Sequence, residues 1–363
     1  MTELKEWQNR NDGYLLDALK WLRLKLLRQI ELTLAQSVSA TVAKPQYTSG
    51  WWIFKSKSGK FQTARVTQMG KSTGVDDTEI AQAAAAMQAA EQIEQPPALL
   101  VLGQRLGLSS FERQVLLLCA AMELDTGIAS LCAQAQGSAN KPYPTFALAM
   151  VLFDEPVWDA LSPERPLRYL RLIEINQSGT LPLTASPLRA DERIVHYIKG
   201  LNYLDDRLAS LLTSMEVTDI RLPQSQEDEA NAISIHIQNV SITQRLLVIQ
   251  LVGLDTESKQ LISNRVAATL GLHLHRLPIE ILPQQSSELE TFARLWERET
   301  RLLPIALYLD VRDVEPVAPT DGATQKTTPL NRFLSRSTGL FFLDTRDVWP
   351  GLGQTTIFDV SSP

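Results

Sequence analysis

The sequence predicts a protein of mixed α and α/β class, and two observations carry that prediction. Up to about residue 212, apolar residues recur mostly at helical spacing, with one short stretch of strand-like pattern. From about Arg245 onward, apolar strands alternate with helices, which implies a parallel sheet with helices on both faces. A length of 363 residues allows two to three domains. We expect three, over residues 1–95, 96–223 and 224–363.

Composition excludes several classes of protein. With 44% apolar and 21% charged residues the chain is globular, and its net charge of −6 does not favour a dedicated nucleic-acid binder. The longest apolar run, Val115 to Met122, is too short to span a membrane, and the first residues lack the apolar core of a secretory signal. Cys119 and Cys132 have neither metal-ligand nor disulfide spacing, so we expect reduced thiols and a cytoplasmic protein.

The first segment is expected to be helical from Tyr14 to Gln36. Its helical stripe consists of Leu15, Leu19, Leu22, Leu26, Ile30 and Leu34. Because basic residues lie on the other faces, such a helix can contact a membrane or a partner, but the leucine-rich stripe favours packing on its own protein. Residues 49–66, with an aromatic run at 51–54, read as a β-hairpin, residues 67–78 as a linker, and Glu79–Ile93 as an alanine-rich helix.

The middle segment has the outline of a winged helix, namely short helices followed by a two-stranded hairpin. We expect helices at Ser110–Leu124, Asp125–Gly137, Thr145–Phe153, Val157–Leu161 and Arg193–Ile198, and strands at Leu167–Ile175 and Leu181–Thr184. The element best placed to be a recognition helix, Thr145–Phe153, contains no Lys, Arg, Asn or Gln, so it offers little to phosphates or bases. Arg165, Arg168 and Arg171 are the basic groups near the hairpin. Protein packing is favoured, and a DNA-binding regulator is the alternative.

After a polar separator at Gln224–Glu229, the last segment alternates strands and helices. The expected strands are Leu246–Val252, His273–Leu277, Ile305–Leu309, Leu340–Leu343 and Thr355–Val360, and the expected helices are Ser258–Leu270, Glu288–Arg301 and Leu330–Ser335. His273 and His275 fall on one side of a strand, but without a third ligand we expect no metal site.

The first of these strands leads into a sequence close to the phosphate-loop template G-x-x-x-x-G-K-[ST]. Gly253 and Lys259 match at the template's spacing, whereas Ser258 stands for the second glycine and Gln260 for the magnesium-binding hydroxyl. A second G-K-S-T sequence, at residues 70–73, lacks both the first glycine and a following apolar helix, so we set it aside. The signal at Gly253 is stronger because it lies at a strand-to-helix junction.

The succession from Arg245 to Pro363 resembles the core of the AAA+ ATPases. That resemblance implies ATP and Mg²⁺ as cofactors, Asp310 at the end of an apolar strand as a magnesium-shell carboxylate, and Thr345 as the polar sensor. It places the vestigial nucleotide-binding residues at Gly253, Ser258, Lys259, Gln260, Asp310 and Thr345.

Several departures from the AAA+ pattern predict a degenerate module. Val311 stands where the family has its water-positioning Glu, and the loss of a general base removes a rate factor of about 10²–10⁴. Asp255 and Glu257 place negative charge in a loop that should hold an anion, and no arginine follows Arg346 before Thr355. We therefore expect no catalytic residue and no hydrolysis, with a slow but genuine NTPase as the alternative.

Further motifs narrow the resemblance. They are Pro96–Leu99, Gly107–Arg113, Leu116–Asp125, Tyr143–Ala149 and Pro187–Tyr197. Together they resemble the winged-helix N-terminal part of the AAA+ ATPases encoded with bacterial extracellular contractile injection systems. That family implies a hexameric ring with two tandem modules, the first degenerate, and protein partners in an injection apparatus, with no nucleic acid or membrane span. The sequence stops at Pro363, after the fifth strand and before a lid or second module, so we expect an N-terminal region of such a protein.

Overall fold

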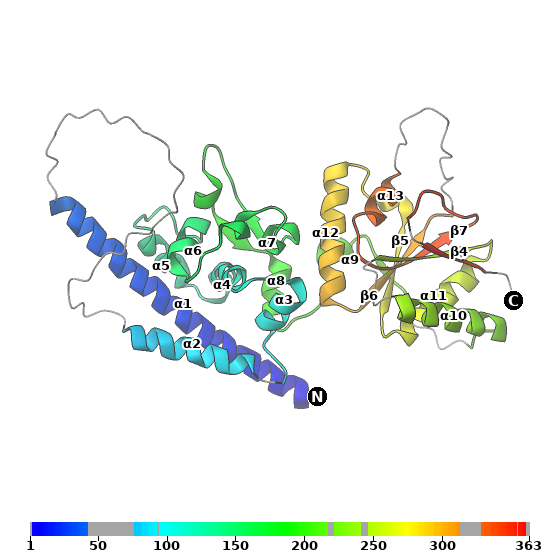
Figure 1. Ribbon diagram of the computed structural model, residues 1–363, viewed down its shortest axis with the longest axis horizontal. Helices are drawn as coiled ribbons and strands as arrows, with labels where there is room; N and C mark the ends of the chain where they lie inside the picture. The colour runs from blue at the N-terminus through cyan, green and yellow to red at the C-terminus, as the bar shows by residue number, and fades with distance from the viewer. Residues whose placement is uncertain are drawn as a thin grey trace. The chain divides into compact units, whose positions relative to one another are not determined.

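The computed structural model describes residues 2–42, 76–92, 94–216, 221–240, 246–312, 328–353 and 355–360 (Figure 1). The chain forms two compact units, each assembled from separate segments. The first unit comprises Met1–Pro97, Ser110–Trp158 and Ile175–Ala190, and the second comprises Ala98–Ser109, Asp159–Glu174 and Asp191–Pro363. The hairpin predicted at 49–66 and the G-K-S-T sequence at 70–73 lie outside the described residues.

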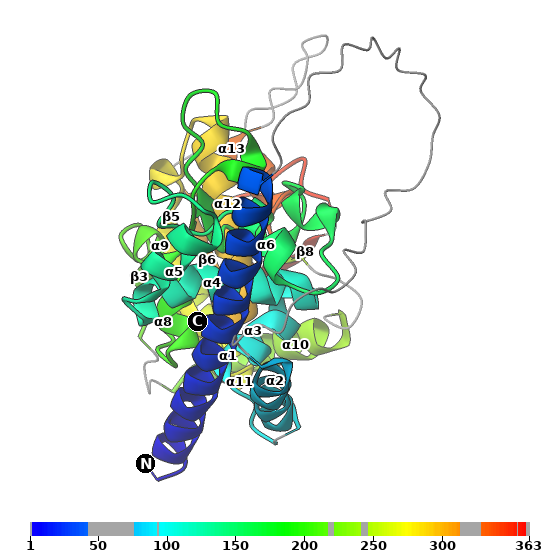
Figure 2. The ribbon, with the colours of Figure 1, turned by 90° about the vertical axis from the view of Figure 1, so that its left-hand side faces the viewer.

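The first unit is organised around one long helix. Its helices are α1 (Thr2–Val42), α2 (Asp77–Glu91), α4 (Ser110–Leu124), α5 (Ile128–Ala135) and α6 (Phe146–Leu152). α1 packs against the other four, and Figures 1 and 2 both show α2 beside it. The residues of α1 that this packing buries are Tyr14, Leu15, Ala18, Trp21, Leu22, Leu26 and Ile30. The prediction that the leucine stripe packs on its own protein is confirmed, although Leu34 at its end is exposed.

Charged and aromatic contacts fix α1 in this position. Arg23 donates two hydrogen bonds to Asp125, each 2.5 Å long, and these bonds lower the pKa of the Asp125 carboxyl below its usual range. Trp21 stacks on Phe153 with ring centroids 5.8 Å apart. Arg23 therefore serves a contact within the unit.

The predicted hairpin of the winged helix is shifted along the chain. Residues 166–169 form a helical turn, α7 (Pro166–Tyr169), and the strand β1 is only Ile173–Ile175. A proline at the first helical position explains the turn, because its ring fixes a helical φ angle. The partner strand is β2 (Leu188–Ala190), and the predicted partner at 181–184 instead enters a 3-10 turn, η2 (Leu183–Ala185), because Pro182 has no N–H for a strand ladder.

The second unit contains a six-stranded, mostly parallel sheet. Its strands are β3 (Thr213–Ser214), β4 (Leu246–Val252), β5 (His273–Pro278), β6 (Ile305–Asp310), β7 (Gly339–Thr345) and β8 (Thr355–Asp359). Their order across the sheet is β3-β5-β6-β7-β4-β8, and only β3 is antiparallel to its neighbour. The prediction of mixed α and α/β class is confirmed, and the five predicted strands of this region are present with small shifts at their ends.

Helices cover both faces of this sheet. α12 (Ser286–Leu302) and α13 (Pro329–Leu334) share one core cluster with the sheet, and α10 (Gln224–Val240) and α11 (Thr256–Thr269) share the other. Alternation along β6 follows from the two-residue repeat of a strand: Leu307 and Leu309 face the α12 side, Ala306 and Tyr308 the α11 side. The polar separator predicted at 224–229 is instead the first part of α10, because its stripe of Ala230, Ile233 and Ile237 continues the helix into the core.

Shorter elements complete the second unit. They are α3 (Ala98–Leu106), η1 (Trp158–Leu161, which begins at the end of the first unit), α8 (Glu192–Ile198), α9 (Asp206–Ala209) and η3 (Ile279–Ile281). α3 and α9 pack on α12, and α3 also packs on α8. Segments that precede the sheet in the sequence therefore contribute to the core of the second unit.

Candidate functional site

The predicted nucleotide-site residues gather at the carboxyl ends of three neighbouring strands. β4 leads into α11, and its two neighbours in the sheet, β7 and β8, come from the last part of the chain. In parallel α/β sheets, ligands bind at such a point, outside the carboxyl ends, where the strand order reverses. Gly253 and Thr345 meet there directly, since the Gly253 N–H donates to the Thr345 carbonyl over 3.1 Å. Asp310 ends β6 one strand away, in register with Asp344 of β7. We call this place the β4–α11 junction.

The loop of the junction is short, and its own carboxylate caps the helix. Only Gly253, Leu254 and Asp255 separate β4 from α11, which begins at Thr256. The Asp255 carboxylate accepts a 3.2 Å hydrogen bond from the Ser258 N–H and a 2.7 Å bond from the Ser258 hydroxyl. A phosphate bound at a helix N-terminus makes the same kind of contact with backbone N–H groups and with the positive end of the helix dipole. Asp255 thus occupies the position in which a phosphate would be stabilised.

Lys259 is fully buried, and its ammonium group has partners inside the protein. Its side chain has no exposed surface, and Nζ donates to the Gly253 carbonyl at 2.8 Å and to the Thr345 carbonyl at 3.0 Å. The third contact is an ion pair with Asp344, which is equally buried. Two of the three N–H donors of the ammonium group are therefore hydrogen-bonded to carbonyls, and the ion pair with Asp344 balances its charge. Sequence reasoning singled out Thr345 and missed Asp344, whose one signal is a carboxylate inside an otherwise apolar strand.

The glycine at the start of the loop is required by the neighbouring strand. Gly253 has φ of +140°, and a Cβ at this residue would lie 2.3 Å from the Val360 carbonyl oxygen. Val360 continues from β8 and donates its N–H to the Val252 carbonyl over 2.7 Å. Close approach of two backbones therefore explains Gly253 without a phosphate.

Asp310 is engaged by two arginines. Arg312 donates two hydrogen bonds of 2.9 Å to its carboxylate, and Arg276 donates another of 2.5 Å. Burial opposes ionisation of this carboxyl, but the arginine contacts outweigh it and lower its pKa to about 2. Arg312 also lies 3.4 Å from the Asp344 carboxylate and donates to the Thr256 hydroxyl at 3.0 Å. The carboxylate predicted for a magnesium shell is therefore the centre of an internal ion-pair cluster.

This geometry does not fit ATP and magnesium. A nucleotide with magnesium would contact Lys259, the N-terminus of α11 and Asp310. Each of these groups already has partners inside the protein. Gln260 follows Lys259 in α11 and is half-buried. Among the described residues, no group of three or more His, Cys, Asp and Glu is arranged to hold a metal ion.

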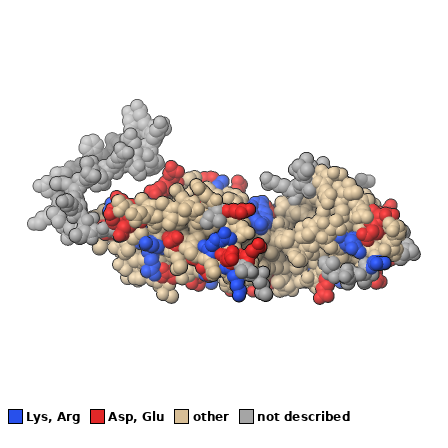
Figure 3. Space-filling model, turned by 90° about the horizontal axis from the view of Figure 1, so that it is seen from below, with Lys and Arg blue, Asp and Glu red and all other residues tan. Residues whose placement is uncertain are grey.

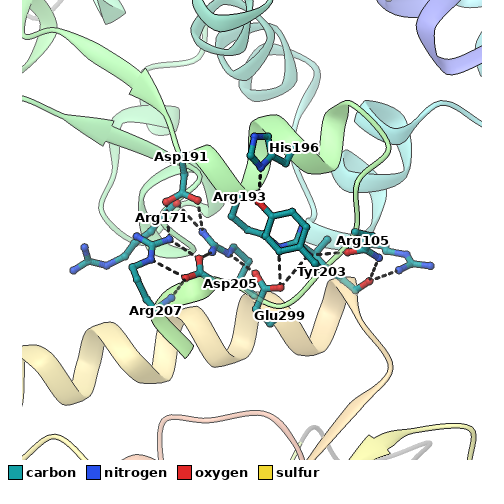
Figure 4. Close-up of polar contacts among 12 residues, drawn as sticks. Arg105, Arg171, Asp191, Arg193, His196, Tyr203, Asp205, Arg207 and Glu299 are labelled. Carbon is teal, nitrogen blue, oxygen red and sulfur yellow. Dashed lines mark hydrogen bonds and ion pairs between the residues drawn. The ribbon is translucent and has the colours of Figure 1, made fainter. Parts of the chain in front are cut away.

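A second charged cluster, which the sequence analysis did not predict, lies along α12 (Figure 4). We call it the α12 network, formed by Asp191, Arg193, Asp205, Arg207, Arg298 and Glu299. Arg298 has no exposed surface and pairs with Asp191, Asp205 and Glu299. Its Nη1 also donates to the Arg171 carbonyl at 3.1 Å, where Arg171 adopts the left-handed conformation with φ of +51°.

The α12 network joins distant parts of the sequence inside the second unit. Arg193 of α8 donates to Glu299 at 3.0 and 3.1 Å and to Asn202 at 2.7 Å. Burial raises the pKa of the Glu299 carboxyl against the opposing effect of Arg298 and Arg193. The ion pairs that join α8 and α9 to α12 link residues about a hundred positions apart in the chain. Spacing along the sequence therefore cannot reveal the α12 network. The network holds the helices that follow β2 against α12.

The residues that the alternative, a DNA-binding regulator, would use are poorly suited to nucleic acid. Within α6 no side chain carries a charge, and Phe146, Leu148, Ala149 and Leu152 are buried. Two arginines near the hairpin contact the protein, since Arg168 donates to the Leu161 carbonyl and Arg171 to the Thr291 hydroxyl. On the face drawn in Figure 3, blue and red side chains alternate over the described residues without a continuous basic stripe.

Short helices followed by a small two-stranded sheet define a winged-helix protein, here continued by a parallel α/β region. The family described as winged helix domain, variant, matches residues 9–212, more than half of the chain. The chain belongs to this family. No curated protein matches the sequence. In the part of the chain that the structure describes, no helix combines the length and the apolar composition needed to cross a bilayer.

Proposed function

We propose that this chain is a non-catalytic assembly and docking region of a AAA+ ATPase, of the kind encoded with bacterial extracellular contractile injection systems. Three features support the P-loop origin of the α/β region. Gly253 and Lys259 lie at the turn between β4 and α11, and β4 lies at the point where the strand order reverses. Asp310 ends the strand on the far side of β7. A winged-helix region precedes this sheet in the sequence, as in that family.

The observation that carries the non-catalytic part of the proposal is the state of Lys259. A phosphate-loop lysine stabilises the charge of a triphosphate only if its ammonium donors can reach it. Here two donors bind carbonyls and the ammonium group forms a buried ion pair with Asp344 inside the protein. Turning the Lys259 ammonium group toward a nucleotide would leave the buried Asp344 carboxylate with one cation fewer, which is costly in a low-dielectric interior. Hydrolysis would then belong to a separate module, and this region would contribute to a ring and to contacts with proteins of the apparatus.

The purified chain tests this proposal by release of phosphate from ATP with magnesium. We expect no release above that of buffer, and no difference between wild type and Lys259→Met. Lys20→Met is the matched control, because Lys20 is exposed on α1. Turnover in the ordinary enzymatic range of about 1–10³ s⁻¹, abolished by Lys259→Met and kept by Lys20→Met, would overturn the proposal and establish an NTPase.

Membership of a winged-helix family favours one other candidate, a DNA-binding regulator. Such a protein would bind duplex DNA with an affinity that falls steeply as salt rises, because cations are released from the phosphates. The uncharged α6 supports protein contacts instead, so we expect no shift of a DNA duplex at low salt. A strong shift that disappears at physiological salt would favour the regulator.

A further inference from the structure

We infer that the exposed end of α6 and the loop after it bind a basic, amphipathic segment of a protein partner. The surface consists of Val151, Pro156, Val157 and Trp158, and we call it the Trp158 surface. The inference rests on the proposed function, because it assigns a place and a partner chemistry to the docking role. The surface comprises residues of the first unit.

Exposure is the first observation. The Trp158 side chain is 69% exposed, and Val151 and Val157 are 61% and 44% exposed. A tryptophan in a protein core buries about 150–250 Å² of surface, so leaving one in water next to Val157 forgoes a large stabilisation. Pro156, Val157 and Trp158 are consecutive in the chain and all exposed. Exposed apolar patches mark interaction sites, and tryptophan is enriched among the residues that dominate binding energy.

The loop itself is held in a conformation that exposes these residues. Phe153, at its start, is buried against Trp21 and lies edge-on to Phe111 with centroids 6.4 Å apart. Glu155 has φ of +55°, a left-handed conformation that is unfavourable for a residue with a side chain. Residues 154–159 are all exposed. A fixed loop start and a strained turn thus present Trp158 in a defined place, which lowers the entropy that binding must overcome.

The charges of the loop select the partner. Asp154 and Glu155 are exposed, and the Asp154 carboxylate, 87% exposed, shares only one oxygen with Lys25 at 2.7 Å. Carboxylates in the same exposed loop as an indole ring attract Lys and Arg, which also bind to the ring face, while Val151 and Val157 provide contacts for apolar side chains. Nucleic acid would be repelled. A second copy of this chain, with a net charge of −6, is also a poorer match than a basic segment.

A labelled 15-residue peptide with lysine and leucine at helical spacing probes this surface on the full chain. Fluorescence anisotropy should show saturable binding that weakens at least about tenfold in Trp158→Ala, as expected for a central interface residue. Glu155→Lys, which reverses one rim charge, should weaken it as well. Leu16→Ala is the matched control, because Leu16 is 69% exposed on α1 and should leave the affinity unchanged. A peptide with glutamate in place of lysine should not bind.

Three results would overturn the inference. They are equal affinity of wild type and Trp158→Ala, equal binding of the lysine and glutamate peptides, and loss of wild-type self-association in Trp158→Ala by sedimentation, which would make the occupant a second copy. Circular dichroism of each variant verifies its fold. Phosphate release from the same samples separates the two proposals, because turnover contradicts only the non-catalytic function and unchanged peptide affinity contradicts only the Trp158 surface.

Discussion

Lys259 and Arg298 are both fully buried cations of the second unit, but their surroundings differ. At the β4–α11 junction, the Lys259 ammonium group contacts one carboxylate and two carbonyls at the ends of adjacent strands. In the α12 network, a guanidinium reaches three carboxylates from three segments of the chain. A compact ammonium suits a local site, whereas the planar fork of arginine can join several partners at once. In both clusters the buried cation is held by partners inside the second unit.

The largest effect is expected at the α12 network. Arg298→Met would leave three buried carboxylates with fewer cations, and the free energy of unfolding of the second unit should fall by about 3–5 kcal/mol. Urea denaturation measures this loss. Arg336→Met is the control, because Arg336 is half exposed and pairs only with Glu290, so its loss should stay below about 1 kcal/mol. Equal losses in the two variants would remove the distinction between a buried network and a surface pair.

A smaller loss is expected at the β4–α11 junction. Lys259→Met should reduce the free energy of unfolding by about 2–4 kcal/mol, because Asp344 keeps a 2.7 Å hydrogen bond from Tyr308 and the nearby Arg312. Adding Asp344→Asn should recover part of the loss. A double-mutant cycle measures the coupling of the two residues, and strict additivity would contradict the ion pair.

Acid should weaken the junction through Asp310. Its folded-state pKa, about 2, lies below the ordinary value of 3.8, so its contribution is complete above about pH 4 and is lost as the pH falls toward 2. Between pH 5 and 2, wild type should lose about 1–2 kcal/mol more than Asp310→Asn, which cannot titrate. Denaturation at a series of pH values measures the difference. Parallel curves for the two proteins would show that Asp310 is not held ionised by the arginines.

The smallest effect is expected at the cap of α11. Asp255→Ala removes a side chain that accepts from the Ser258 N–H, and a lost N-cap costs about 1 kcal/mol. Thermal unfolding measures the change. Glu257→Gln serves as the control, since Glu257 is exposed in the same turn and should change stability little. An unchanged melting temperature in Asp255→Ala would argue against its role as the cap.

Local patterns predicted most of the second unit and part of the first. The helix at Ser110–Leu124 and the strand at Leu246–Val252 match the structure at both ends, because their apolar periodicity agrees with the packing they enter. Proline chemistry explains the errors at residues 167–184, where Pro166 and Pro182 override the apolar pattern. The whole of α10 was missed, because its polar first turns conceal a short apolar stripe.

The candidate site was predicted in position but not in detail. Gly253, Lys259 and Thr345 could be placed together because strand ends of a parallel sheet meet at one edge. The sequence could not show that Lys259 turns inward to Asp344, because that depends on the register of β4 against β7. The α12 network depends entirely on tertiary packing, with partners such as Asp191 and Arg298 far apart in the chain.

In this account, the polar groups of the β4–α11 junction bind partners within the protein. Calorimetric titration of the purified chain with ATP and magnesium, up to millimolar ligand, tests this claim most directly. If the donors of Lys259 and the N-terminus of α11 are held by the protein's own acceptors, the titration gives no heat beyond dilution, in wild type and in Lys259→Met alike. A saturable heat in wild type that disappears in Lys259→Met would contradict this account.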